Sequence, residues 1–216
     1  FGAYTAFALA GAEIQFETLE TACNIPLQKP NISLLLQCQA LELPRQPYQF
    51  RDDRIAAILS IDSLGSELFG MAGIGKIQVP VLLIAGSHDA TAPLALEQIR
   101  IFQWLTSPYH YLAVIQGKTH IQDMRRLISN LDLQLKLSPQ QSQLSQISQT
   151  SLFEEYMNAL SLTFFHQHFQ PVGDTTMPPL SANYGAYISH PPYKLWLISQ
   201  RSSQHLKQTL QALTSG

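Results

Sequence analysis

The amino-acid sequence predicts an α/β fold built on a parallel sheet. Three short runs, at residues 55–61, 79–85 and 109–115, are almost continuously apolar, as strands are when both faces of a parallel sheet are covered. The segment 94–105 between the last two runs has apolar residues at helical spacing. Because strand, helix and strand alternate, we expect right-handed crossovers between parallel strands. Loops that carry catalytic residues should then lie at the carboxyl ends of the strands.

The composition predicts one globular core and disfavours several functions. The chain has 216 residues, of which 45% are hydrophobic and 13% charged, with a net charge of −2, so nucleic acid is not an expected partner. No apolar run approaches the roughly 20 residues of a membrane span. The glycines at 70–75 do not join a strand to a helix, and no metal-ligand spacing is present, so we expect no cofactor and no metal.

The first residues resemble the second half of a strand-turn-helix motif. Residues 1–12 are rich in alanine and glycine, like the helix that follows a G-x-S-x-G nucleophile elbow, cut directly after its serine. Phe1 would then supply a backbone N–H to the oxyanion hole, and Gly2 would be the last glycine, packed closely against the strand. Taken alone, these residues fit an ordinary packed helix better than a nucleophile elbow.

Two later loops carry candidate catalytic residues. Asp89 follows the run at 79–85, and His120 follows the run at 109–115. Imidazole titrates near neutral pH, which suits His120 to the role of general base. The acid is either Asp89 or Asp62, which ends the run at 55–61; the Gly-x-x-Asp turn before a helix favours Asp89. Asp89 also fits a turn residue or a helix cap.

The order elbow, aspartate, histidine is the chain order of the α/β-hydrolase triad. On this order, the sequence resembles the C-terminal part of a bacterial, cyanobacterial-type α/β-hydrolase, similar to dienelactone hydrolase-like and platelet-activating-factor acetylhydrolase-like proteins. In the first group the acid corresponds to Asp89, and in the mammalian members of the second to Asp62. The stretches that carry the resemblance are 1–12, 54–70, 77–93 and 104–120.

The resemblance implies a serine hydrolase of carboxylic esters that forms an acyl-enzyme. It implies a small-molecule or lipid ester as substrate, no cofactor, and a nucleophilic serine directly before Phe1, so that this chain alone would be inactive. The alternative is a truncated, inactive remnant or interaction module. That alternative predicts an exposed apolar strand edge at 55–61 and self-association of the chain.

The resemblance also divides the chain into regions. Residues 1–136 would be the C-terminal part of the hydrolase core, with a lid-like insertion at 13–50 that includes a short helix near 34–41. Residues 137–151 would be a Gln/Ser-rich linker, and residues 152–216 a helical extension that packs on the core.

Two cysteines, Cys23 and Cys38, allow one disulfide, and two buried thiols would explain them equally well. Because the related bacterial proteins often look exported, the resemblance favours the disulfide. It also favours a periplasmic or secreted location over a cytoplasmic one.

Overall fold

A single four-stranded sheet organises the molecule, in the strand order β1-β2-β3-β4. The computed structural model describes residues 2–25, 31–120, 143–170 and 176–204, with the backbone alone for 143–151. The strands are β1 (Ile58–Ile61), β2 (Val81–Gly86), β3 (His110–Ile115) and β4 (Leu195–Ser199). The first three are parallel, and β4 runs antiparallel to β3. The predicted α/β class with parallel strands is confirmed.

The first strand is shorter than the apolar run predicts. Residues 55–61 are apolar almost throughout, but β1 starts only at Ile58, because Ile55 N donates to Asp52 O in a turn. In the described part of the chain β1 lies at the edge of the sheet. Its last residue, Ile61, is 39% exposed.

The fourth strand differs from the expected helical extension at 152–216. Leu195 and Leu197 are buried while Trp196 between them is 47% exposed. This alternation is typical of an antiparallel strand with one face on the core. The C-terminal region therefore adds a strand to the sheet as well as packing helices against it.

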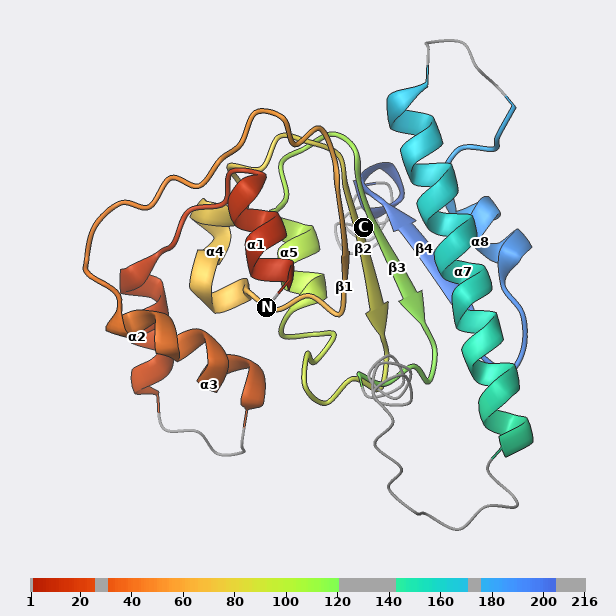
Figure 1. Ribbon diagram of the computed structural model, residues 1–216, viewed down its shortest axis with the longest axis horizontal. Helices are drawn as coiled ribbons and strands as arrows, with labels where there is room; N and C mark the ends of the chain where they lie inside the picture. The colour runs from red at the N-terminus through yellow and green to blue at the C-terminus, as the bar shows by residue number, and fades with distance from the viewer. Residues whose placement is uncertain (1, 26–30, 121–142, 171–175, 205–216) are drawn as a thin grey trace, which may run out of the picture.

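Helices cover both faces of the sheet (Figure 1). On one face lie α1 (Gly2–Leu9), α4 (Ser66–Ile74) and α5 (Gln98–Trp104); on the other lie α7 (Gln143–Phe169) and α8 (Ala182–Ile188). Strand β2 divides its side chains between the two cores: Val81 and Leu83 face the first group of helices, and Leu82 and Ile84 face the second. All six residues of β2 are buried, which explains its unbroken apolar run.

The long helix α7 begins inside the segment expected to be a linker. It starts at Gln143, so residues 143–151 are helical, whereas 137–142 and the whole of the expected helix at 121–136 lie outside the described residues. Glutamine is a good helix former, and serine is tolerated, so a Gln/Ser-rich composition is compatible with helix. Tyr156, Leu160 and Phe164 of α7 are buried against the sheet. The division of the chain into regions stays a prediction.

The excursion at 13–50 forms a small helical unit beside the core (Figure 1). It contains α2 (Phe16–Asn24), α3 (Ile32–Cys38) and the 3-10 turn η1 (Gln39–Glu42). The helix expected near 34–41 is thus confirmed. Cys23 of α2 and Cys38 of α3 form a disulfide. Of the two alternatives that the sequence left open, a bridge or two thiols, the structure has the bridge.

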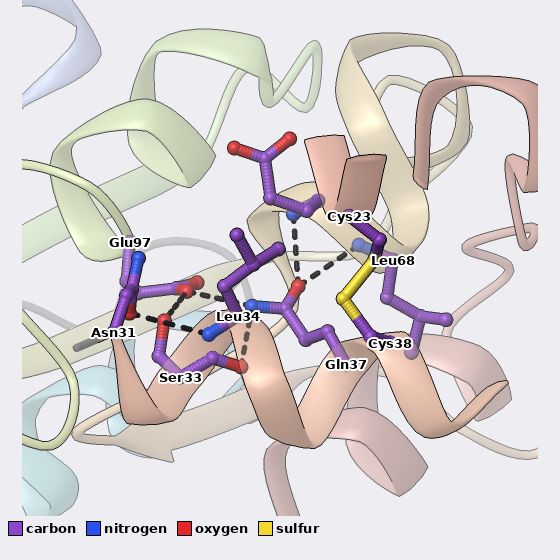
Figure 2. The surroundings of a disulfide bond; sticks show 9 residues. Cys23, Asn31, Ser33, Leu34, Gln37, Cys38, Leu68 and Glu97 are labelled. Carbon is purple, nitrogen blue, oxygen red and sulfur yellow. Dashed lines mark hydrogen bonds between the residues drawn. A yellow bond between two sulfur atoms is a disulfide. The ribbon is translucent and has the colours of Figure 1, made fainter. Parts of the chain in front are cut away.

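Figure 2 shows how α3 is attached to the core next to this disulfide. The buried carboxylate of Glu97 accepts hydrogen bonds from Ser33 Oγ (2.5 Å) and Gln37 Nε2 (2.8 Å) with one oxygen. Its other oxygen accepts from Gly65 N and Ser66 N, both at 3.0 Å. These two N–H groups belong to the start of α4, where a helix leaves its donors without internal partners. Glu97 therefore joins α3 to the first turn of α4.

Gln37 extends the same attachment. Its side-chain oxygen accepts from the backbone N–H groups of Glu67 and Leu68, at 2.8 and 2.9 Å. The excursion is thus bound to α4 through buried polar contacts as well as through the apolar core.

Among the described helices, none is both long enough and apolar enough to cross a bilayer.

Candidate active site

Three predicted site residues meet at the carboxyl edge of the sheet. Asp62 follows β1, Asp89 follows β2 and His120 follows β3, and parallel strands bring such loops to the same edge. Figure 1 shows the arrowheads of β2 and β3 next to each other. One carboxylate oxygen from each aspartate and one ring nitrogen of His120 all lie within 4.8 Å of one another.

His120 and Asp89 are joined directly. The distance from His120 Nδ1 to Asp89 Oδ2 is 2.8 Å; the Asp89 side chain is 1% exposed and that of His120 is 29% exposed. Because an ionised carboxylate only accepts hydrogen bonds, Nδ1 carries the hydrogen and Nε2 is left as the basic nitrogen. This is the orientation that a histidine general base requires.

The carboxylate of Asp89 is itself held by its own loop. Its Oδ1 accepts hydrogen bonds from Thr91 N and Ala92 N, both at 2.8 Å. Asp89 is therefore both a turn residue, through Oδ1, and the partner of His120, through Oδ2. The backbone bonds fix the carboxylate so that Oδ2 points at the imidazole.

Asp62 has a different partner. Its Oδ2 forms an ion pair with Lys118 Nζ, and its Oδ1 accepts from Gly86 N at 3.2 Å. The two side chains of the ion pair are 4% and 2% exposed. Asp62 also has a φ of 47°, in the left-handed region that aspartate tolerates better than most residues. The structure thus places Asp62 near His120, with its charge matched by a buried lysine.

The loop that carries His120 lies tightly against the end of β2. Lys118 O accepts from His88 N at 3.0 Å, and Gly117 N donates to Ser87 Oγ at 2.9 Å. A Cβ on Gly86 would lie 2.3 Å from Lys118 O, so only glycine allows this approach. Gly117 has a φ of 79°, which favours glycine as well.

A pocket of about 420 Å³ connects His120 with the beginning of α1. Its walls are mostly small or apolar and come from α1, from β1 and from the loop after β1. The lining residues are Gly2, Ala3, Tyr4, Ala6, Leu59, Ser60, Ile61, Asp62, Leu64 and His120. His120 and the start of α1 therefore line the same space.

Two expectations concern the start of the chain. Phe1, the expected oxyanion-hole residue, lies outside the described residues. Gly2 begins α1, but a Cβ placed on it would meet no atom within 4 Å. The strand against which Gly2 was expected to pack would precede Phe1, so the close packing of Gly2 stays a prediction.

Tyr4 lines the pocket as a neutral phenol. Burial, reinforced by the negative charge of Glu97, raises the pKa of Tyr4 well above its ordinary value. The phenol therefore keeps its proton throughout the physiological range, and Tyr4 adds no negative charge to the pocket.

The fold gathers a set of potential metal ligands that spacing along the chain does not reveal. Asp62, Asp89 and His120 each offer one ligand atom within the 4.8 Å cluster. The ammonium group of Lys118 is already bound to Asp62, and a cation placed beside it would be repelled. Asp89 directs its oxygens to backbone N–H groups and to the imidazole. The chemistry of this cluster fits proton transfer better than metal binding.

Two other histidines, His110 (buried) and His168 (partly buried), lie away from this edge. Burial lowers the pKa of His110, whose Nδ1 contacts Ser107 O at 2.5 Å at the opposite end of β3 from His120. Burial also lowers the pKa of His168 on α7, which lies among the rings of Tyr109, Tyr111 and Phe164. Both are packing residues of the core.

Sequence reasoning missed Lys118. A lysine in a loop is expected to be solvated. Its partner Asp62 lies 56 residues earlier in the chain, and no sequence pattern indicates that the two residues pair. The available signal is positional: Lys118 stands two residues before the candidate histidine, directly after the Gly117 turn, in the loop that follows β3.

No family model and no curated protein matches the sequence. Among solved structures, the chain is similar to a monoacylglycerol lipase from Paleococcus ferrophilus, with 17% identity and a TM-score of 0.24. The alignment covers 57% of this chain and 55% of the lipase, so it spans about half of that protein. This likeness is too slight to carry an argument, and the function must be argued from the site.

Proposed function

We propose that this chain supplies the histidine and the acid of an α/β-hydrolase that cleaves carboxylic esters. The observation that carries the proposal is the 2.8 Å bond from Asp89 to His120 at the carboxyl edge of a parallel sheet, with His120 facing a pocket. A buried carboxylate behind a half-buried imidazole is the arrangement that makes histidine a directed general base. The order of Asp89 and His120 along the chain supports the same reading.

In the proposed mechanism, His120 Nε2 accepts the proton of a serine hydroxyl as its oxygen attacks the ester carbonyl. Asp89 stabilises the imidazolium that forms, and the backbone N–H of Phe1 donates to the oxyanion. The tetrahedral intermediate collapses, the C–O bond to the alcohol breaks, and His120 returns the proton to the departing alcohol. Water repeats the sequence on the acyl-enzyme and releases the acid.

The serine of this proposal would directly precede Phe1 in the full protein. The position of the pocket supports this placement, because Gly2 and His120 line it together. A residue at the start of α1 would therefore face the imidazole.

The pocket walls favour an ester with an apolar acyl group or a lipid ester. Leu59, Ile61 and Leu64 supply apolar surface on the side of β1, and burial of a hydrocarbon chain there would be favourable by about 0.8 kcal/mol per CH₂. Tyr4, uncharged on the evidence of its raised pKa, is compatible with a neutral substrate.

The experiment is active-site labelling of the full protein with a fluorophosphonate, followed by mapping of the modified peptide. We expect the label on a serine directly before Phe1, and hydrolysis of p-nitrophenyl esters that His120→Gln abolishes. His190→Gln, at an exposed histidine, is the matched control and should retain activity. Labelling at another residue, or hydrolysis unaffected by His120→Gln, would contradict the proposal.

The exposed edge of β1 favours a second candidate, an inactive chain that assembles with another copy. Ile61 is 39% exposed on a strand whose outer edge is unpaired in the described residues, and such edges recruit further strands. Analytical ultracentrifugation of residues 1–216 tests this candidate. A monodisperse monomer would rule it out.

A further inference from the structure

Lys118 is a buried cation two residues before the proposed base. Its side chain is 2% exposed, forms an ion pair with Asp62 and places Nζ 5.1 Å from the ring centroid of Phe153 on α7. A lysine at this depth needs a carboxylate, because burying an unpaired charge is costly. The pair therefore fixes the Lys118 side chain to the end of β1.

The main chain of the same residue is fixed to the next strand. Lys118 O accepts from His88 N, which follows β2, while Lys118 N donates to Ile115 O at the end of β3. The residue thus contacts the ends of all three parallel strands. Since His120 is only two residues further along, its backbone position depends on these contacts.

We propose that the Asp62–Lys118 ion pair is a positioning pair for His120, and that Lys118 also cancels the charge of Asp62 at the imidazole. Asp89 is then the carboxylate that controls the His120 proton. The inference rests on the proposed function where it concerns catalysis, but its electrostatic part concerns the titration of His120 alone.

The electrostatic step follows from the distances. An oxygen of Asp62 lies within 4.8 Å of a ring nitrogen of His120. At this separation, in a site that is largely buried, an uncompensated carboxylate would strongly favour the protonated imidazole. A protonated imidazole cannot accept the proton of a nucleophile. The ammonium of Lys118 opposes that effect.

Among the residues that the structure describes, the other titratable groups around His120 do not reproduce the effect of Lys118. Asp89 is bonded to His120 through Nδ1, and Tyr4 lines the same pocket as a neutral phenol. The described titratable groups that share the cluster or the pocket with His120 are Asp89, Asp62 and Tyr4, and Lys118 is the ion-pair partner of Asp62.

The test is an NMR titration of the His120 ring in the full protein. Lys118→Met should raise the His120 midpoint by about one pH unit or more, because it leaves the negative charge of Asp62 alone. Asp62→Asn should lower the midpoint, because it leaves the positive charge of Lys118 alone. The double variant should return the midpoint close to that of the unmodified protein.

The opposite shifts of the His120 midpoint distinguish this role from a merely structural one. If the pair only held the loop in place, both single variants would disturb the loop and would not shift the midpoint in opposite directions. Lys76→Met removes an exposed lysine paired with Glu13 and is the matched control; it should leave the midpoint in place. If Lys118→Met does not fold, Asp62→Asn and the double variant still decide the sign. Midpoints that stay unchanged, or move the same way in both single variants, would overturn the inference.

A kinetic measurement distinguishes this inference from the proposed function. In hydrolysis of a p-nitrophenyl ester, the acidic limb of the kcat/KM profile should follow the NMR midpoint of each variant. Opposite midpoint shifts without any hydrolysis would leave the pair's effect on His120 standing and remove the esterase proposal. Hydrolysis with unmoved midpoints would remove the inference and leave the esterase proposal.

Discussion

His120 and Asp89 are 31 residues apart in the chain, yet Nδ1 of one lies 2.8 Å from Oδ2 of the other. The two loops can meet because β2 and β3 are adjacent and parallel, in register from Val81 opposite His110 to Gly86 opposite Ile115. The bond sets which imidazole nitrogen is basic. Its loss should therefore affect chemistry more than stability.

The first prediction concerns the choice of acid. Asp89→Asn keeps the shape of the side chain but presents an amide to Nδ1, so the wrong tautomer is favoured and kcat should fall on the order of 10³ to 10⁴-fold. Asp62→Asn should cost much less, because Asp62 pairs with Lys118. Steady-state hydrolysis by both variants of the full protein is the measurement. The reverse ranking would make Asp62 the acid.

The second prediction concerns the disulfide. Replacing Cys23 and Cys38 with alanine opens a loop with a sequence separation of 15, which should lower the free energy of unfolding by about 3 kcal/mol in the chain-entropy model. Urea denaturation measures this change. Addition of a reductant should destabilise the unmodified protein and leave the double alanine variant unaffected; equal sensitivity of both would contradict the bridge.

The third prediction concerns Glu97. Both of its carboxylate oxygens accept from donors, so Glu97→Gln turns an NH₂ group towards other donors and should cost about 1–3 kcal/mol in unfolding free energy. Glu13→Gln breaks the more exposed pair with Lys76 and should cost less than about 1 kcal/mol. Similar losses in both variants would show that the buried network adds nothing.

The fourth prediction concerns pH and His110. Burial holds the pKa of His110 below its ordinary value in the folded protein, so the unfolded chain binds more protons as the pH falls through the ordinary histidine range. Stability should therefore decrease on acidification. His110→Gln should weaken this dependence in thermal melts between pH 7.5 and pH 5, whereas His190→Gln at an exposed site should not. An unchanged slope in His110→Gln would contradict the assignment.

The fifth prediction concerns the close approach of two loops. A methyl group on Gly86 would lie 2.3 Å from Lys118 O, so Gly86→Ala must displace the loop that carries His120, at a cost of about 1–3 kcal/mol. Gly2→Ala, where a Cβ meets nothing within 4 Å, is the control for stability. Chemical denaturation compares the two variants; equal stability would show that the loop yields freely.

The sequence predicted the parts of this molecule whose physical signal is local. Strands β2 and β3 were predictable because sheets covered on both faces need continuous apolar runs, and the meeting of Asp89 and His120 at one edge because each follows such a run. Strand β4 was missed because it has only five residues, of which Leu195 and Leu197 alone are buried. The Asp62–Lys118 pair depends on a contact across 56 residues, for which a single sequence contains no periodic signal.

The attachment of the excursion has a consequence for any motion near the site. Glu97 stands in the segment that leads from Asp89 to α5, and it binds Ser33 and Gln37 of α3 directly. The excursion therefore cannot swing away as an independent flap while these bonds last. A displacement of α3 would have to break these bonds or carry Glu97 with it, and Glu97 belongs to the segment that begins with Asp89.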